Sequence, residues 1–408
     1  MVIASALVVG TIVVLNTNPS KHPATDMDPR ADSSCDNPKP REECREIEVG
    51  GTTYRYAIIE AEVETPNTAI VDFGGPGISA LSGKYRIQDF KESLPALRDY
   101  NLLVIEEPWV TAEPEQSCTA LLSAYYETAR SGKGVTESSV RLARSCLSDK
   151  GRWGFDPSSY RSAVDQIEEH ENISLRGFIG YSFGSQRIAY LEGRDMGWAV
   201  LVRPFPVGAS GSELLSSRLK QTKRLRSLYS ESETGGQPEG LPPNSETSTF
   251  DYASAELALA YLNQTQLQSR GPDIFARQND ALAARLSDSL WLRYGVDSIS
   301  PGYLAYLSEV CVREGTWEIS EGSQVANVLN SLHAPCSSIE ETGKVSRSGP
   351  AEVPDETCIV TSETDPLASE SLIKEYIGQN ENTSWLDSPE DSHVAQDGTS
   401  ECLREVGL

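Results

Sequence analysis

Short runs of β-branched and aromatic residues alternate with helical stretches along this chain, and no other feature constrains its fold as strongly. The runs with strand character lie at residues 53–62, 68–73, 101–105, 177–181, 199–202 and 357–361. A helix is expected at residues 159–170, where apolar side chains recur at helical spacing. Because strands that alternate with helices pair in parallel, the sequence predicts an α/β fold with a mainly parallel central sheet and helices on both faces.

The pattern changes between residues 205 and 354, where strand character disappears. Helical candidates follow one another there at residues 212–229, 252–267, 275–291 and 301–312. The Gly-, Pro-, Ser- and Glu-rich stretch 231–249 separates the first two and is expected to form a loop. We interpret residues 205–354 as a helical lid inserted into a sheet domain formed by residues 45–204 and 355–408.

The cysteines favour disulfide bonds over a metal site. There are eight, an even number, with no CxxC pair and no histidines at zinc spacing. If neighbours in the sequence pair, the bridges are Cys35–Cys44, Cys118–Cys146, Cys311–Cys336 and Cys358–Cys402, although other connectivities remain open. Neither a metal nor a cofactor is expected.

Disulfide bonds form in oxidising compartments outside the cytoplasm, and the N-terminus also indicates such a location. Residues 2–15 are apolar but too few to span a bilayer comfortably, so they resemble a signal-peptide core, with a membrane anchor as the alternative. A proline-rich linker at residues 20–43 follows, and we therefore interpret residues 1–44 as a signal- or anchor-like segment and linker. The expected location is secreted or extracytoplasmic, with a membrane contact only through that anchor.

The charge balance excludes some partners. With 60 acidic and 35 basic residues the formal net charge is −25, which disfavours nucleic acid and anionic membrane surfaces. A cationic substrate is tolerated or favoured by such a charge. The expected partner is a small molecule or a short peptide.

The segment Gly180-Tyr181-Ser182-Phe183-Gly184 directly follows one of the predicted strands, and a helix is expected after it at residues 185–192. Serine is a weak nucleophile unless its oxygen is exposed and a base lies beside it. A sharp strand-to-helix turn with flanking glycines provides such a geometry, the nucleophile elbow. Ser182 is therefore the candidate nucleophile, and the alternative is an unreactive Ser-Gly turn.

A histidine must serve as the base. The chain has four, at His22, His170, His333 and His393. Folds with a nucleophile elbow order their catalytic residues as serine, acid and then histidine. Only His393 follows the last predicted strand, because the others lie in the linker, before the elbow and in the helical block. His393 is thus the candidate base.

The acid is expected in the loop after the strand that precedes this histidine, where its carboxylate can hold the imidazole in the correct tautomer. Asp365 fits this position, and Glu363 is the rival. The oxyanion needs two backbone N–H groups. One is expected from Phe183, and the other from the glycine-rich turn after the strand at residues 68–73, with Gly74 and Gly75 as candidates.

From about residue 45 to the C-terminus, these motifs resemble the proline-iminopeptidase-like branch of the α/β-hydrolases, and most closely the secreted tripeptidyl-aminopeptidase-like proteins of actinobacteria. The likeness rests on Gly74-Gly75-Pro76-Gly77, the elbow, the acid loop at residues 362–366, and His393 followed by Ser400-Glu401-Cys402. The resemblance implies an α/β-hydrolase fold with a lid and an exo-acting aminopeptidase that works through an acyl-enzyme. It also implies Ser182, Asp365 and His393 as catalytic residues.

Two segments depart from the family. Glu106-Glu107-Pro108-Trp109 stands where the family has Asp-Gln-Arg-Gly, and Arg203-Pro204-Phe205 stands where it has Leu-Asp-Gly. A peptidase needs acids that bind the substrate ammonium, and Glu106 and Glu107 are candidates by position, with Trp109 and Tyr181 as further substrate-binding candidates. The departures keep an esterase, lactonase or acyltransferase of a specialised metabolite open as an alternative, and also a catalytically silent binding protein.

Overall fold

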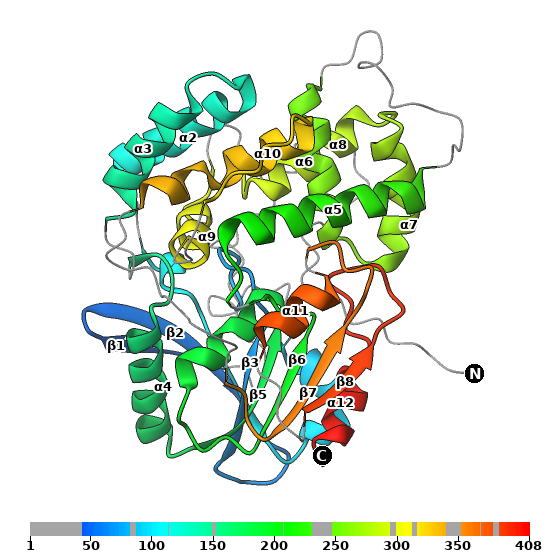
Figure 1. Ribbon diagram of the computed structural model, residues 1–408. Coiled ribbons are helices and arrows are strands. Elements are labelled where there is room, and N and C mark those ends of the chain that lie inside the picture. Colours follow the sequence, from blue (N-terminus) through cyan, green and yellow to red (C-terminus); the bar gives the residue numbers. More distant parts are fainter. Residues whose placement is uncertain are drawn as a thin grey trace.

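A computed structural model of the chain describes residues 43–408 except 82–86, 113, 149–151, 207, 231–246, 294–298, 312–315, 340–351, 368 and 378–382. Two parts stand out in Figure 1, a central sheet flanked by helices and a group of helices above one end of it. The predicted N-terminal signal-like segment and most of the predicted loop 231–249 lie outside the described residues.

The sheet has the strand order β1-β2-β4-β3-β5-β6-β7-β8. Its strands are β1 (Glu43–Val49), β2 (Thr52–Ile59), β3 (Asn67–Asp72), β4 (Asn101–Ile105), β5 (Ser174–Tyr181), β6 (Trp198–Val202), β7 (Glu356–Thr361) and β8 (Thr383–Asp387). The pairs β1/β2 and β2/β4 are antiparallel and the five other pairs are parallel. This mainly parallel sheet is that of the α/β-hydrolase fold, so the predicted fold class is confirmed.

The two strands that the sequence analysis did not predict lie at the edges of the sheet. β1 reads Glu-Cys-Arg-Glu-Ile-Glu-Val, and every residue of β8 is at least partly exposed. The inner parallel strands are buried on both faces and therefore read as continuous apolar runs, whereas edge strands do not. β1 also begins at Glu43, so the fold starts two residues earlier than the predicted start at residue 45.

Helices cover both faces of the sheet, as predicted. On one face, α4 (Pro157–Glu171) and α11 (Glu370–Tyr376) belong to the apolar cluster that contains Ile58. On the other face, α1 (Ile87–Ser93) and α12 (Thr399–Glu405) belong to the cluster that contains the neighbouring Ile59. Successive side chains of a strand point to opposite faces, so both apolar layers come from the same strands.

The helices above the sheet form what we call the helical layer. From the predicted lid it contains α5 (Gly211–Tyr229), α6 (Thr249–Ala258), α7 (Gln264–Phe275), α8 (Asp280–Leu290), α9 (Gly302–Val310) and α10 (Gln324–His333). The helix expected at residues 252–267 is in fact two helices, because Asn263 caps the N-terminus of α7 and forms a capping box with Gln266. α10 was not predicted.

Two further helices belong to the helical layer although their sequence lies within residues 45–204. They are α2 (Gln116–Ser131) and α3 (Val135–Cys146). The aromatic side chains of α2 pack with the lid, since the ring of Tyr126 lies edge-on to Trp291 with centroids 5.7 Å apart, and apolar side chains of α3 belong to the same cluster. Figure 1 shows both helices beside α10 and away from the sheet. The boundary proposed at residue 205 therefore separates segments that share one apolar core.

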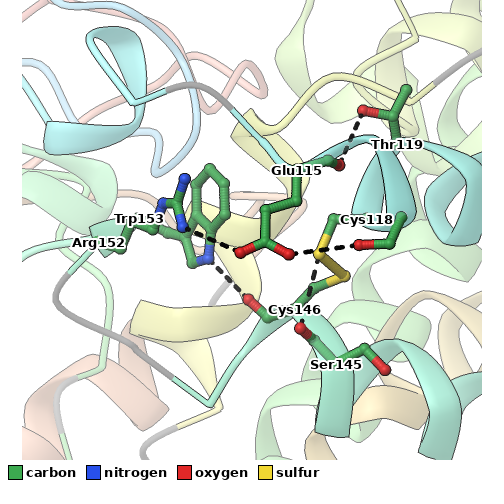
Figure 2. The surroundings of a disulfide bond; sticks show 8 residues. Glu115, Cys118, Thr119, Ser145, Cys146, Arg152 and Trp153 are labelled. Atoms are coloured by element: carbon green, nitrogen blue, oxygen red, sulfur yellow. Dashed lines mark hydrogen bonds and ion pairs between the residues drawn. A yellow bond between two sulfur atoms is a disulfide. The ribbon is translucent and has the colours of Figure 1, made fainter.

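Three of the four predicted disulfides are confirmed. Cys118–Cys146 joins α2 to α3, Cys311–Cys336 joins the end of α9 to the turn after α10, and Cys358–Cys402 joins β7 to α12. Figure 2 shows the first, where the Nε1–H of Trp153 donates to the carbonyl of Cys146 at 2.7 Å. Cys35 of the fourth pair lies outside the described residues. Among the described helices none has the length and apolar character needed to cross a membrane.

Candidate active site

Ser182 lies at the carboxyl end of the central strand β5, at the first residue of the 3-10 helix η5 (Ser182–Leu191). Its φ is 50°, in the left-handed region that residues other than glycine rarely adopt. A Cβ on Gly180 would lie 2.7 Å from Ser185 Cα, and one on Gly184 would overlap Asp72. The two glycines thus allow the sharp turn. The helix expected at residues 185–192 begins three residues earlier, at the serine itself.

The structure brings Ser182, His393 and Asp365 together from three separate segments. His393 Nε2 lies 2.7 Å from Ser182 Oγ, and His393 Nδ1 lies 2.8 Å from Asp365 Oδ2. Because the carboxylate only accepts, Nδ1 carries the proton and Nε2 is left to accept the serine hydroxyl. Asp365 lies in the loop after β7, and His393 lies between β8 and α12.

The rival acid Glu363 does not contact His393. Its side chain is 78% exposed, and it pairs with Arg224 at 3.3 Å. His170 is exposed on α4, and its Nε2 lies 3.9 Å from Glu171. His22 lies outside the described residues.

Asp365 is buried beside a cation, Arg203, that the sequence analysis noted only as a departure from the family. Burial opposes ionisation of Asp365, but the electrostatic interaction and hydrogen bond with His393 and the charge of Arg203 outweigh it and hold its pKa below the ordinary value. Arg203 Nη1 lies 3.6 Å from Asp365 Oδ2, and its Nη2 donates to Ser388 and to the carbonyl of Glu390. Arg203 therefore keeps the carboxylate ionised and anchors the loop that carries His393.

His333 lies nearer to the candidate nucleophile than its position in the sequence suggests. It lines the same cavity as Ser182, from the end of α10. Its Nδ1 lies 2.9 Å from the carbonyl of Leu329 and so carries the proton, which leaves Nε2 to accept from the Tyr306 hydroxyl at 2.6 Å. Burial lowers the pKa of His333 to about 3, and the charge of Arg218 adds to this effect. With both nitrogens engaged, it is a neutral structural residue.

The predicted oxyanion loop packs directly against the elbow. A Cβ on Gly74, whose φ is 81°, would lie 2.6 Å from the carbonyl oxygen of Tyr181. The N–H of Gly74 donates to Asp72 Oδ1 at 2.9 Å, so the loop itself uses this donor. Gly75 and Phe183, in contrast, line the cavity together with Ser182. The geometry therefore favours Gly75 and Phe183, and not Gly74, as oxyanion donors.

A buried charge cluster lies beneath the elbow, around Arg187 of η5. Its guanidinium contacts Asp72 at 2.6 Å, Glu107 at 2.6 Å and Glu309 at 3.0 Å. Burial lowers the pKa of Arg187, but the three carboxylates outweigh this effect and raise the pKa well above its ordinary value. Burial and the nearby Glu309 raise the pKa of Glu107 despite Arg187. The cluster joins the elbow, the ends of β3 and β4, and helix α9.

The cluster corrects the assignment of Glu107 as a substrate-binding acid. Glu107 is 3% exposed, and it accepts from Gly77 N–H at 2.7 Å and from Trp109 Nε1–H at 2.9 Å as well as from Arg187. Its oxygens are thus occupied by the protein. Trp109 is fully buried within the core of the helical layer, so it is not a substrate-binding residue either.

Glu106 and Tyr181 are likewise turned away from the cavity. Glu106 is 1% exposed and accepts from the Ser79 hydroxyl at 2.6 Å and from the N–H groups of Ala80 and Leu81. Burial raises its pKa. The Tyr181 hydroxyl lies 3.1 Å from Thr399 Oγ1 on the face covered by α12. Alternation along β5 explains this, because the residue before the serine points into the sheet core.

The cavity above Ser182 is lined mostly by the helical layer. It has a volume of about 40 Å³ for the centres of water-sized spheres and is partly open to solvent. Its lining residues are Gly75, Ser182, Phe183, Phe205, Leu214, Leu215, Arg218, Tyr261, Tyr306, Val310, Trp317, His333 and Leu367. The sequence analysis missed most of these residues, because the sequence does not show which faces of the lid helices point towards Ser182.

No protein-family model and no curated protein match the chain. Among solved structures it is similar to a proline iminopeptidase-related protein from Thermus thermophilus, with 14% identity, coverage of 90% of this chain and 97% of that chain, and a TM-score of 0.39. It is also similar to the enol-lactonase from Burkholderia xenovorans, with 13% identity, coverage of 89% and 99%, and a TM-score of 0.43. A third is epoxide hydrolase A from Mycobacterium thermoresistibile, with 13% identity, coverage of 90% and 98%, and a TM-score of 0.40. Similarity at this level says nothing about the activity of this chain.

Proposed function

We propose that the protein is a serine hydrolase that cleaves an ester or amide through an acyl-enzyme. The observation that carries the proposal is the continuous line of hydrogen bonds from Asp365 through His393 to Ser182, at the sharp turn after β5. A base within hydrogen-bond reach, held in turn by a buried carboxylate, is what an activated serine requires. This arrangement weighs against a catalytically silent binding protein.

In the proposed reaction, Ser182 Oγ attacks the substrate carbonyl carbon while His393 Nε2 takes its proton. The carbonyl oxygen becomes negative and accepts from the N–H groups of Gly75 and Phe183. The bond to the leaving group then breaks, and His393 passes the proton to that group. Water attacks the acyl-serine and gives a proton to His393, and collapse returns that proton to Ser182 and releases the carboxylic acid.

The resemblance to aminopeptidases implies an acid that binds the substrate ammonium, and none of the described residues that line the cavity is an acid. Glu106 and Glu107, the predicted acids, are buried against their own partners. Among the described lining residues the charged side chain is that of Arg218, a cation. The lining therefore supports the alternative, an esterase or lactonase, over an exo-acting tripeptidyl or prolyl aminopeptidase.

We further propose that the protein works outside the cytoplasm. Three disulfides among the described residues are typical of proteins from oxidising compartments. We also propose residues 205–354 as a lid, and helices α2 and α3 share its apolar core.

The test is steady-state hydrolysis of p-nitrophenyl butyrate and of alanyl and tripeptidyl p-nitroanilides by the wild type and by Ser182→Ala. We expect turnover of the ester, and a loss of roughly 10³-fold or more in kcat on removal of the nucleophile. Ser400→Ala, which removes an exposed hydroxyl, is the matched control and keeps wild-type rates. Turnover of the anilides alone would restore the aminopeptidase assignment, and an unchanged rate in Ser182→Ala would refute serine catalysis.

A further inference from the structure

Arg218 lies on helix α5 and lines the cavity that contains Ser182. Leu214, one helical turn earlier on the same face, lines it too. Arg218 is 7% exposed, so its guanidinium is almost entirely removed from solvent. The Tyr261 ring lies 5.7 Å from Arg218 Cζ, and the same ring lies edge-on to His393, with centroids 6.5 Å apart. Arg218 is therefore a neighbour of the reacting groups.

The guanidinium has no counter-charge in the part of the chain that the structure describes. Arg218 Nε and Nη2 are buried and have no hydrogen-bond partner among the described residues, and no carboxylate there lies within ion-pair distance of the side chain. Two other buried arginines behave differently, since Arg187 contacts three carboxylates and Arg203 contacts two. An arginine stays charged at all accessible pH values, and a buried charge without a partner is costly. A cost of this kind is typical of a residue that binds an anionic ligand.

We propose that Arg218 binds a carboxylate of the substrate within reach of Ser182, so that the protein hydrolyses esters or lactones that carry a free carboxyl group. The inference rests on the proposed serine hydrolase function and specifies its substrate class. A guanidinium matches the planar, bidentate geometry of a carboxylate. The described residues of the cavity lining offer one fixed positive charge, which balances one carboxylate but leaves a phosphate dianion only half compensated.

The charge of Arg218 in the cavity affects an anionic substrate more strongly than the net charge of the whole chain. The net charge of −25 repels anions at long range, but exposed charges are screened within about 10 Å at 0.1 M salt. Arg218 lies in the cavity itself, where screening is much weaker. The same charge repels the ammonium group of a peptide N-terminus, and no carboxylate stands among the described lining residues to bind that group.

The experiment compares esters that differ only in one negative charge. The acyl-side pair is mono-p-nitrophenyl glutarate and its methyl ester, and the alcohol-side pair is 4-carboxyphenyl acetate and its methyl ester. In the wild type we expect kcat/KM to be about 10-fold or more higher for the charged member of one pair, because a hydrogen bond to a charged group contributes at least that factor. The ratio within a pair cancels any general loss of folded enzyme.

Three variants assign the preference to the side chain. Arg218→Gln is expected to reduce the ratio to about one while the neutral esters are still hydrolysed, and Arg218→Lys, which keeps the charge but not the planar fork, retains part of it. Lys220→Gln removes a positive charge from an exposed position of the same helix and is expected to keep the wild-type ratio. A ratio of one or less in both wild-type pairs, or an unchanged ratio in Arg218→Gln, would overturn the proposal.

A binding measurement separates this inference from the catalytic one. Isothermal titration calorimetry with monomethyl glutarate, which carries one carboxylate, is expected to show binding to the wild type and to Ser182→Ala but not to Arg218→Gln. If no ester is hydrolysed but monomethyl glutarate binds in this pattern, serine hydrolysis fails and the carboxylate site stands. If the esters are hydrolysed and monomethyl glutarate does not bind to the wild type, the carboxylate site fails alone.

Discussion

Replacing Arg187 by methionine tests whether the buried charge cluster holds the elbow in place. The guanidinium contacts Asp72, Glu107 and Glu309 within 3.0 Å, and Arg187 is 2% exposed. Removal of one partner from a buried ion pair typically costs about 3–5 kcal/mol, because the remaining charge is left unpaired. We therefore expect the free energy of unfolding of Arg187→Met at pH 7.5 to be lower by about 3–5 kcal/mol.

The loss of unfolding free energy in Arg187→Met should become smaller as the pH falls. The pKa values of Glu107 and Glu309 are already raised by burial, and loss of the arginine removes the cation that opposes this shift. A carboxyl whose pKa is higher in the folded than in the unfolded state takes up its proton first in the folded state, so stability is gained as the pH falls towards the unfolded value. Each such proton recovers up to about 1.4 kcal/mol per pH unit.

Urea unfolding monitored by tryptophan fluorescence at pH 7.5 and pH 5.5 measures both effects. Arg176→Met is the matched control, because Arg176 is half exposed and its pair with Asp195, at 3.8 Å, lies on the surface. Such pairs contribute about 1 kcal/mol or less. The reasoning is refuted if Arg187→Met unfolds within about 1 kcal/mol of the control, or if its deficit is the same at both pH values.

Two further predictions concern Arg203 and His333. Arg203→Gln removes the cation that helps to hold the pKa of Asp365 low, so we expect kcat to fall by roughly 10-fold with KM little changed. We also expect the acid limb of the pH–rate profile to move to higher pH, and Arg203→Lys should restore part of both effects. An acid limb that does not move in Arg203→Gln would exclude this positioning role. His333, with a pKa of about 3 when folded, stays neutral while the unfolded chain takes up a proton below about pH 6.5. The contribution of His333 to the free energy of unfolding is therefore lost as the pH falls from 6.5 towards 3. Between pH 6.5 and pH 4.5, the free energy of unfolding of His333→Asn, measured with a chemical denaturant, should change less steeply with pH than that of the wild type, by up to about 1.4 kcal/mol per pH unit. Equal slopes for the variant and the wild type would contradict this.

The inner strands were predictable because burial on both faces writes a continuous apolar run into the sequence, as in β4 and β6. The edge strands β1 and β8 carry polar residues and give no such signal. The fold class followed from the alternation of strands and helices, and the positions of Ser182, Asp365 and His393 from motifs whose order along the chain is constrained.

The predictions of substrate-binding residues were wrong because the sequence does not show in which direction a side chain points. Glu106 and Glu107 follow β4 at the correct edge of the sheet, but both turn inwards to backbone N–H groups or to Arg187, which no local pattern reveals. Arg218 was missed for the converse reason. Nothing in the sequence distinguishes it from other arginines of α5, and only the packing of the helical layer places it, unpaired, above Ser182.

The central claim is that Ser182 is an activated nucleophile, and covalent labelling tests it most directly. Intact-protein and peptide mass spectrometry after treatment with a fluorophosphonate should show one adduct per chain, on the peptide that contains Ser182. The adduct should be absent from Ser182→Ala and should form much more slowly in His393→Gln, in which the base is lost. No adduct on the folded wild type, or an adduct that persists in Ser182→Ala, would contradict the account.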